Sequence, residues 1–292
     1  MVITLAILNK ASGPYWNMLK RRLGEDGIAP LTITHIPNLI GHPFGLAILA
    51  AFGMFVLPSD PVFYLCWTLM IAIAAVMNIF AIIGLLEAKF FTTQVIGSLG
   101  FVSGCICAVI FLGESLNVWA ICSICLAVVG VVLFSWKKRD HTDVFAFDRG
   151  TIFTIIAVLL SGFTAVLYKV ATRHAGSYGA LFSGRFVSDL IAWTIAWLVS
   201  LAVIRRNPLK DAGNVLRKEY GLLYVFGMIL MTAVDSWLYV RLPVVTISML
   251  GTIAFPVTYL ISRFSYRERI TRSMWMGTAC IVGSIILFIN TR

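Results

Sequence analysis

Residues 61–86 read PVFYLCWTLMIAIAAVMNIFAIIGLL, and this stretch contains no Asp, Glu, Lys or Arg. A helix needs roughly 20 apolar residues to cross the hydrocarbon core of a bilayer. The stretch therefore predicts a membrane-spanning helix. Six further stretches of 19 residues or more lack the same four residue types, namely 36–59, 90–112, 115–136, 150–168, 242–262 and 273–291.

Three weaker stretches are apolar but carry charge inside them. They are 1–19 with Lys10, about 178–204 with Arg185 and Asp189, and 220–240 with Asp235. The whole chain of 292 residues is 60% hydrophobic and 12% charged, whereas soluble domains are about 45–50% apolar and about 25% charged. We therefore expect an all-α membrane protein with ten transmembrane helices. The apolar N-terminus lacks a basic leader and a cleavage site, so it is interpreted as the first span.

The order of these spans indicates an internal repeat. The polar linker 137–149 separates a first five-helix repeat, 1–136, from a second, 150–292. Five is an odd number, so the second repeat would enter the membrane upside down. Inverted repeats of this kind are common in transporters and place a substrate site between them. A shift of 154 residues aligns Thr92 with Thr246, Gly97 with Gly251, Ser98 with Thr252, Phe101 with Phe255 and Glu114 with Glu268; near the starts a shift of 149 or 150 aligns Lys20 with Lys169 and His35 with Arg185.

The net charge of +10 comes from basic residues that lie between the apolar runs. Seventeen Lys and Arg residues fall in loops after odd-numbered spans and four on the opposite face. Cytoplasmic loops are enriched in Lys and Arg, so the odd-loop face is predicted to be cytoplasmic and both termini external. No basic stripe alternates with aromatic residues, which argues against nucleic acid as a partner.

A short motif follows the fourth predicted span. Residues 110–116 read IFLGESL, and a glycine-containing span ending in VGVVL at 129–133 comes next. The motif, its position and the five-plus-five pattern resemble the drug/metabolite transporter superfamily, in particular its EamA-type ten-helix permeases. A second copy, SYRERI at 265–270 followed by GSIIL at 283–287, looks like a degenerate version with Arg267 in place of Gly113.

The resemblance implies a secondary transporter, commonly an exporter of amino acids, other metabolites or drugs. It also implies a central cavity between the halves, with the fifth and tenth spans at the periphery. Family members of this size usually have cytoplasmic termini, whereas the charge distribution predicts external ones. The sidedness of the termini is therefore left open.

Ionisable residues within spans are the best candidates for a site, because each costs roughly 2.5–3.5 kcal/mol on insertion scales. Asp235 can bind and release a proton or face a cationic substrate, or it can form a structural ion pair with Lys10 or Arg185. Arg185 and Asp189 lie four residues apart on one helix face and can pair. Arg185 can instead bind a substrate carboxylate. Lys10 is near the N-terminus and can snorkel to the membrane surface.

Further candidates share a place in the repeat or carry an aromatic ring. His35 aligns with Arg185, and Asn78 aligns with Thr232. Four aromatic residues can form walls of a cavity, namely Trp16, Tyr168, Trp237 and Tyr239, although aromatic residues near span ends are more often interface anchors. His35 can equally be a hydrogen-bonded interior group, with His42 on roughly the same helix face. Glu114 and Glu268 are interpreted as structural, and Pro256 is expected to kink its span.

These observations predict a secondary transporter that works as an exporter by alternating access. Its substrate would be a small polar metabolite, an amino acid or a drug. Coupling of transport to protons is left open. The expected partners are a small-molecule substrate and membrane lipid, and a homodimer is left open. The expected location is a bacterial inner membrane, as an integral multi-pass protein. We expect no cofactor and no metal, because all six cysteines lie in apolar runs and the Cys122–Cys125 pair has no second pair or nearby His.

Two alternatives remain open at this point. One is a flippase-like protein that moves lipids or other amphiphiles. The other is a membrane-embedded enzyme, for which Asp189 and Asp235 could form a protease dyad. No Gly-x-Gly-Asp motif surrounds either aspartate, and the chain has neither a His-Glu-x-x-His motif nor a Gly-x-x-x-x-Gly-Lys-Ser/Thr phosphate-binding loop.

Overall fold

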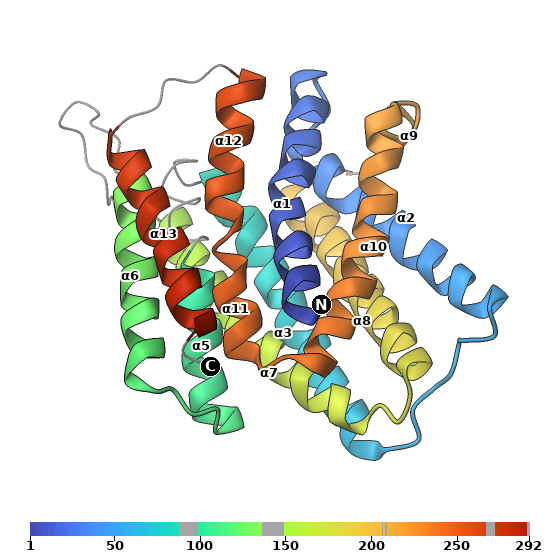
Figure 1. The fold of residues 1–292 in the computed structure, drawn as a ribbon. Helices are drawn as coiled ribbons and strands as arrows, with labels where there is room; N and C mark the ends of the chain where they lie inside the picture. The colour runs from blue at the N-terminus through green and yellow to red at the C-terminus, as the bar shows by residue number, and fades with distance from the viewer. Residues whose placement is uncertain (88–98, 136–148, 206, 208, 267–271, 291–292) are drawn as a thin grey trace. The chain divides into compact units, whose positions relative to one another are not determined.

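The computed structural model describes residues 1–87, 99–135, 149–205, 207, 209–266 and 272–290 (Figure 1). All regular elements in this part of the chain are helices, with no strand among them, so the predicted all-α class is confirmed. The helices are α1 (Val2–Glu25), α2 (Pro30–Ala51), α3 (Pro61–Glu87), α5 (Gly100–Leu112), α6 (Val118–Ser135), α7 (Arg149–His174), α8 (Tyr178–Val199), α9 (Ala212–Leu216), α10 (Glu219–Arg241), α11 (Val244–Gly251), α12 (Ala254–Tyr266) and α13 (Arg272–Asn290).

Three of the described helices are long and apolar enough to cross a membrane, by length and composition. They are α7, α10, and α8 together with the π-helical turn Ser200–Ile204 that continues it. Shorter apolar helices occupy Pro61–Met77, Gly100–Leu112, Val118–Leu133, Val244–Val257 and Trp275–Asn290. The first part of the predicted span 90–112 lies outside the described residues. The count of ten spans therefore stays a prediction.

The predicted span 242–262 is interrupted in its middle. Helix α11 ends at Gly251 and α12 begins at Ala254. Pro256 lies in the first turn of α12. Proline has no N–H, and its ring clashes with the carbonyl four residues earlier, here that of Thr252. The sequence predicted a kink at Pro256, and the structure has a break between two helices just before it.

The described helices group into two compact units, each built from separate stretches of the chain. Unit 1 comprises Met1–Tyr15, Ile83–Val166 and Leu242–Arg292, and unit 2 comprises Trp16–Ile82 and Leu167–Arg241. Each unit thus contains residues from both predicted repeats. The predicted division at the linker 137–149 is based on sequence similarity between two repeats, whereas the two units are defined by contacts. The predicted division therefore stays a prediction.

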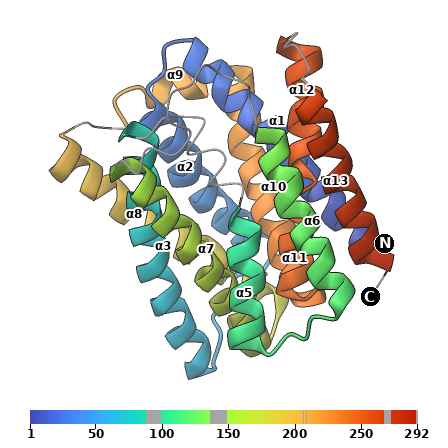
Figure 2. The same cartoon turned by 90° about the vertical axis from the view of Figure 1, so that its left-hand side faces the viewer.

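In unit 1 the most extensive contact is between α6 and α13, which run side by side (Figure 2). Ser123 on α6 donates a hydrogen bond of 2.8 Å to the carbonyl oxygen of Ser284 on α13. A Cβ atom added to Gly130 would lie only 2.9 Å from the carbonyl oxygen of Gly277. Small residues on both helices therefore let the two backbones approach closely. Helices α5 and α11 form the second extensive pair in this unit.

The Gly113-Glu114 motif has a structural role in unit 1. Gly113 ends α5 in the left-handed conformation, with φ of 63°, which favours glycine. Glu114 then accepts hydrogen bonds from the backbone N–H groups of Val244 at 2.8 Å and Val245 at 3.0 Å. These are among the first N–H groups of α11, which have no partner within their own helix. The carboxylate caps α11, as the structural interpretation of Glu114 predicted.

Replacement of Glu114 by alanine is expected to destabilise the protein, because it leaves both N–H groups of α11 without their acceptor. Loss of a helix cap typically costs about 0.5–2 kcal/mol. Glu114→Gln should cost less, since its single carbonyl oxygen can still accept. The thermal midpoint of the purified protein in detergent measures the effect, with Ser115→Ala as the control. Equal midpoints for Glu114→Ala and the control would rule out the cap.

Unit 2 is organised around α2, α8 and α10, with α2 against α8 as its most extensive contact. One apolar cluster joins α3, α7 and α8 through Phe63, Cys66, Trp67, Met70, Tyr168, Ala171, Ala175 and Leu181. A second joins α1, α2, α9 and α10 through Leu19, Leu23, Ile28, Ile33, Ile36, Val215 and Tyr224. Helices that are distant in sequence thus share cores in unit 2.

A polar contact joins the end of α7 to the start of α3 in unit 2. The His174 ring nitrogen Nδ1 lies 2.8 Å from Asp60 Oδ2, and the backbone N–H of Val62 donates to Asp60 Oδ1 at 2.8 Å. The hydrogen bond from His174, followed by the one from Val62, holds the pKa of the Asp60 carboxyl below its ordinary value. The carboxylate is thereby favoured at the start of α3.

The stability of the protein is expected to depend on Asp60 in mild acid. A carboxyl group whose folded pKa is lowered stabilises the fold above its unfolded pKa of about 3.9, and this contribution disappears as pH falls through the folded pKa. Wild type should therefore exceed Asp60→Asn in thermal midpoint near neutral pH, and the gap should close below about pH 4. Ser59→Ala serves as the control. A constant gap across pH would contradict this.

Candidate functional site

An ion pair lies inside α8, within an otherwise apolar helix. Ser177 begins this helix, because its side-chain oxygen accepts a hydrogen bond of 3.1 Å from the N–H of Ala180. Arg185 and Asp189 follow on the next two turns. The Arg185 Nε atom lies 2.7 Å from Asp189 Oδ2. The pairing that the four-residue spacing predicted is therefore present.

An aromatic ring lies against the Arg185 guanidinium. Its central carbon lies 4.9 Å from the centre of the Tyr168 ring, which belongs to the last turns of α7. Tyr168 is 1% exposed. Its ring in turn meets that of Tyr239 on α10 edge to face, with the ring centres 5.0 Å apart. A guanidinium over a ring face is stabilised by the ring's electron density, so Tyr168 stabilises the position of Arg185, and Tyr239 packs on Tyr168.

Further titratable side chains lie within electrostatic range of this pair. The charge of Asp235 on α10 acts on both Arg185 and Tyr168. Arg185 and Asp189 both act on His42 of α2, whose ring centre is 5.8 Å from that of Phe186. His42 is 2% exposed, and neither of its ring nitrogens has a hydrogen-bond partner in the part of the chain that is described. We call Arg185, Asp189, Tyr168, Tyr239, Asp235 and His42 the polar cluster.

Lys169 adds a second positive charge beside the polar cluster. Its ammonium group donates a hydrogen bond to the backbone carbonyl of Tyr239. This bond ties the end of α7 to α10 at the residue whose ring supports Tyr168. Lys169 therefore fixes the position of the tyrosine pair.

The structure brings three of the eight predicted site residues together, namely Arg185, Asp189 and Asp235. The other five have different surroundings. His35 is fully buried, with its ring centre 5.3 Å from that of Trp193. Trp16 packs against Gly227, where an added Cβ would lie 2.3 Å from the indole. The Arg241 guanidinium covers the ring of Trp237 at 5.7 Å near the end of α10.

Asn78 and Lys10 complete the predicted set. Asn78 belongs to α3, and its side chain lies outside the described residues. Lys10 is on α1 in unit 1, so it belongs to a different unit from the polar cluster. The role predicted for each of these two residues stays a prediction.

Sequence reasoning gave less weight to the groups that complete the polar cluster. Tyr168 and Tyr239 were only two of several aromatic residues, and no spacing rule connects them to Arg185. His42 was placed on the same face as His35, which the repeat alignment favoured. No sequence signal distinguishes the two histidines, because only the antiparallel packing of α2 on α8 brings Phe186 beside His42 and Trp193 beside His35.

The arrangement can bind a charged group and handle a proton. Arg185 presents a fixed, planar set of N–H donors, which suits a carboxylate or a phosphate. Asp189 and Asp235 place two carboxyl groups near this guanidinium. His42 is the residue type that titrates near neutral pH.

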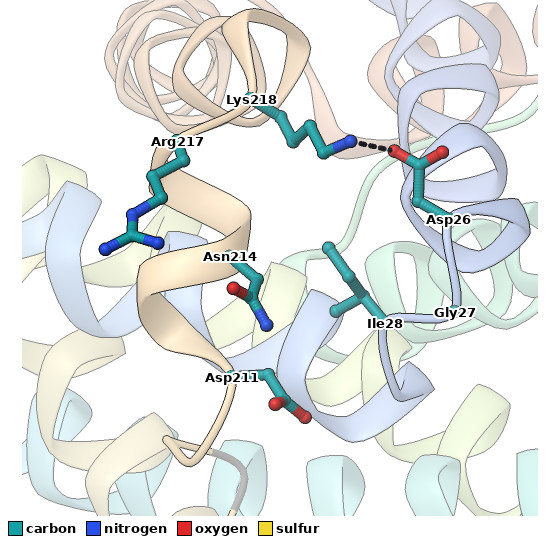
Figure 3. A pocket seen from close by; sticks show the side chains of 7 residues that line it. All are labelled: Asp26, Gly27, Ile28, Asp211, Asn214, Arg217 and Lys218. Atoms are coloured by element: carbon teal, nitrogen blue, oxygen red, sulfur yellow. Dashed lines mark ion pairs between the residues drawn. The ribbon is translucent and has the colours of Figure 1, made fainter.

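A second, shallower site lies at the loops of unit 2. It is a cavity of about 230 Å³ lined by Asp26, Gly27, Ile28, Asp211, Asn214, Arg217 and Lys218 (Figure 3). Lys218 Nζ lies 3.0 Å from Asp26 Oδ2, whereas the Arg217 guanidinium points away from this pair. A ligand there would compete with the ion pair for both charges. We interpret the cavity as a space between loops that are joined by this ion pair. An ion pair at an exposed position contributes little to stability.

Comparison with known proteins gives a fold and no family. No family model matches this chain, and no curated protein matches it in sequence. A solved crystal structure of a protein matches with a TM-score of 0.73, covering 99% of this chain and 96% of that chain at 14% identity. At this identity the likeness concerns the fold alone, which therefore extends over nearly the whole length of both chains.

Proposed function

We propose that this chain is a secondary transporter that moves a small polar solute across a membrane by alternating access. The observation that carries this proposal is the polar cluster, whose members other than His42 of α2 lie on α7, α8 and α10. These are the three described helices that are long and apolar enough to span a bilayer. Charged side chains inside a span are costly and are retained chiefly for solute, ion or proton pathways.

The proposed architecture is ten spans in two inverted five-helix repeats. In that scheme α2, α5 and α6 belong to spans 2, 4 and 5, and their equivalents in the second repeat are α8, α11 and α13. The three most extensive helix contacts join these same equivalents, α2 with α8, α5 with α11 and α6 with α13. Contact between equivalent elements is expected beside a twofold axis, so the packing supports the repeat.

The α6–α13 contact supports the repeat at the level of residues. The shift of 154 that aligns Glu114 with Glu268 also carries Ser123 to Gly277 and Gly130 to Ser284. Ser123 contacts Ser284, and Gly130 contacts Gly277. The repeat alignment therefore maps the contact of Ser123 with Ser284 onto the contact of Gly277 with Gly130. Such reciprocity is the property of a self-complementary interface between two related elements.

The family we propose is the EamA-type branch of the drug/metabolite transporters, in a bacterial inner membrane and working as an exporter. Its support is the Gly113-Glu114 motif, whose glycine ends α5 and whose glutamate caps α11. A reporter active only in the cytoplasm, fused to the C-terminus, tests the sidedness predicted from the charge distribution. Reporter activity would place the termini inside, as is usual in the family.

Transport by purified protein in lipid vesicles tests the proposed function. Uptake of a panel of labelled amino acids, organic acids and cationic drugs is measured with and without a pH gradient, against empty vesicles. We expect flux of at least one solute that requires the protein. Turnover of a lipid or peptide without any solute flux would favour the flippase or enzyme alternative instead.

Asp235→Asn is expected to reduce proton-driven flux by about tenfold or more, because the amide cannot carry the charge that acts on Arg185 and Tyr168. Exchange flux without a pH gradient should be less affected. The measurement is initial uptake in vesicles at matched protein content. Asp211→Asn makes the same chemical change in a loop and should leave flux unaltered. Full coupling in Asp235→Asn would reduce Asp235 to a structural role.

A further inference from the structure

The Arg185 guanidinium has only part of its bonding capacity occupied. Its Nε edge is taken by Asp189, and one face lies over Tyr168. The Asp189 contact is made by Nε, and the two terminal amino groups lie beyond it on the same guanidinium. The Arg185 side chain is also 32% accessible, although it sits within an apolar helix. Its outer edge can therefore accept a ligand without displacing Asp189.

We propose that the outer edge of Arg185 binds the carboxylate of the transported solute, and that His42 takes up one proton as this carboxylate binds. This inference rests on the proposed function, and it names the substrate class and the proton-binding residue of the same site. Two parallel N–H donors fit the two oxygens of a carboxylate in a bidentate geometry. The solute would be a monocarboxylate.

The charge balance of the site explains why one proton should accompany the anion. Arg185 and Lys169 carry two positive charges, and Asp189 and Asp235 carry two negative ones. A bound carboxylate adds a negative charge where little water is available to stabilise it. One more positive charge restores neutrality, and a protonated imidazole supplies it. A dianion, such as a dicarboxylate or HPO₄²⁻, would leave an excess negative charge, so the balance favours a monocarboxylate.

His42 is the group best placed to supply this charge. It is buried, and its two ring nitrogens have no hydrogen-bond partner within the described residues. From α8 the charged groups that act on it are Asp189 and Arg185. Helix α10, which also packs on α2, brings Asp235 to the same cluster. Short α9, also in contact with α2, carries no titratable side chain within Ala212–Leu216.

The step is a simple proton and anion uptake. The imidazole of His42 accepts a proton from water at one ring nitrogen, and the carboxylate forms two hydrogen bonds to the Arg185 amino groups. No covalent bond of the solute changes. Because binding takes up a proton, affinity for the carboxylate should rise as pH falls, by up to tenfold per pH unit where one proton is bound.

Binding by the full-length protein in lipid nanodiscs tests the proposal. Acetate, benzoate and phenylacetate are titrated at about pH 5.5 and about pH 7.5, a range in which histidine titrates and these carboxylates stay largely ionised. Their neutral carboxamides serve as matched probes. We expect at least one carboxylate to bind more tightly at the lower pH, and its carboxamide to bind about 100-fold more weakly or not at all.

Variants assign the two roles separately. Arg185→Gln should lower carboxylate affinity about 100-fold, and Arg185→Lys about tenfold, because lysine keeps the charge and loses the paired donors. His42→Gln should still bind the carboxylate at the higher pH but lose the dependence on pH. Unchanged pH dependence in His42→Gln would overturn the proton role, and unchanged affinity in Arg185→Gln would overturn the anion role.

Failure of this inference can be told from failure of the proposed function. If no carboxylate binds at millimolar concentration while the vesicles carry neutral or cationic solutes, the substrate class is wrong and the transporter proposal stands. If the vesicles carry no solute of any class, the proposed function itself fails. Preferential binding of inorganic phosphate over every carboxylate would likewise overturn the monocarboxylate assignment.

Discussion

Replacement of Arg185 by glutamine is expected to abolish solute flux and to lower the stability of the protein. The substitution leaves Asp189 with a negative charge and no ion-pair partner. Breaking a buried pair in this way costs about 3–5 kcal/mol, and partial accessibility of both side chains should reduce the cost to roughly 1–3 kcal/mol. Initial flux in vesicles and the thermal midpoint in detergent measure the two effects.

A charge-swapped variant separates the loss of function from the loss of stability. Arg185→Asp combined with Asp189→Arg keeps an ion pair at the same spacing but moves the guanidinium one turn away from Tyr168. We expect it to recover most of the thermal midpoint and none of the flux. Flux equal to wild type in the swapped variant would show that only neutralisation of charge matters, and not the position of the guanidinium.

The second large effect is expected at Gly184, next to Arg185 on α8. A Cβ atom added to Gly184 would lie 1.4 Å from Trp67 Cζ2, and Trp67 is 6% exposed in the core of unit 2. The ring cannot move away without disturbing its neighbours, since Phe63 packs on it with ring centres 4.1 Å apart. Gly184→Ala should therefore cost at least about 3 kcal/mol, at the upper end of overpacking penalties.

A double substitution tests whether the clash is the cause. Trp67→Leu alone should destabilise the protein by removing a large buried ring, and Gly184→Ala should then add little to that loss. Thermal midpoint and monodispersity on size exclusion provide the measurements. Gly13→Ala is the matched control, because nothing lies within 4 Å of a Cβ added at Gly13. Equal losses for Gly184→Ala in both backgrounds would exclude the contact with Trp67.

The sequence predicted the features that depend on local order along the chain. Long apolar runs predicted helices, and the four-residue spacing predicted the Arg185–Asp189 pair. The glutamate of the Gly-Glu motif was interpreted as structural, and it caps α11. Each of these follows from residues a few positions apart or from the length of an apolar run, because helix geometry is local.

The features that depend on packing between distant helices were not predictable from one sequence. Tyr168 lies against Arg185, and Tyr239 against Tyr168, only because the ends of α7 and α10 come close to α8. The choice between His35 and His42 depends on the register of α2 against α8, which residue types do not specify. The grouping into two units follows from which helix faces fit together. A sequence with nearly uniform hydrophobicity gives little information on those faces.

Unit 1 is built from stretches that are far apart in the sequence, and this affects how it forms during synthesis of the chain. Helix α6 finds its main partner in α13, and roughly 140 residues separate the end of one from the start of the other. At about 5–20 residues per second, α6 is complete on the order of 10 s before α13 emerges from the ribosome. During that interval its small-residue face at Ser123 and Gly130 is open to lipid or to other proteins. The main interface of α6 is thus completed only by α13, the last of the described helices.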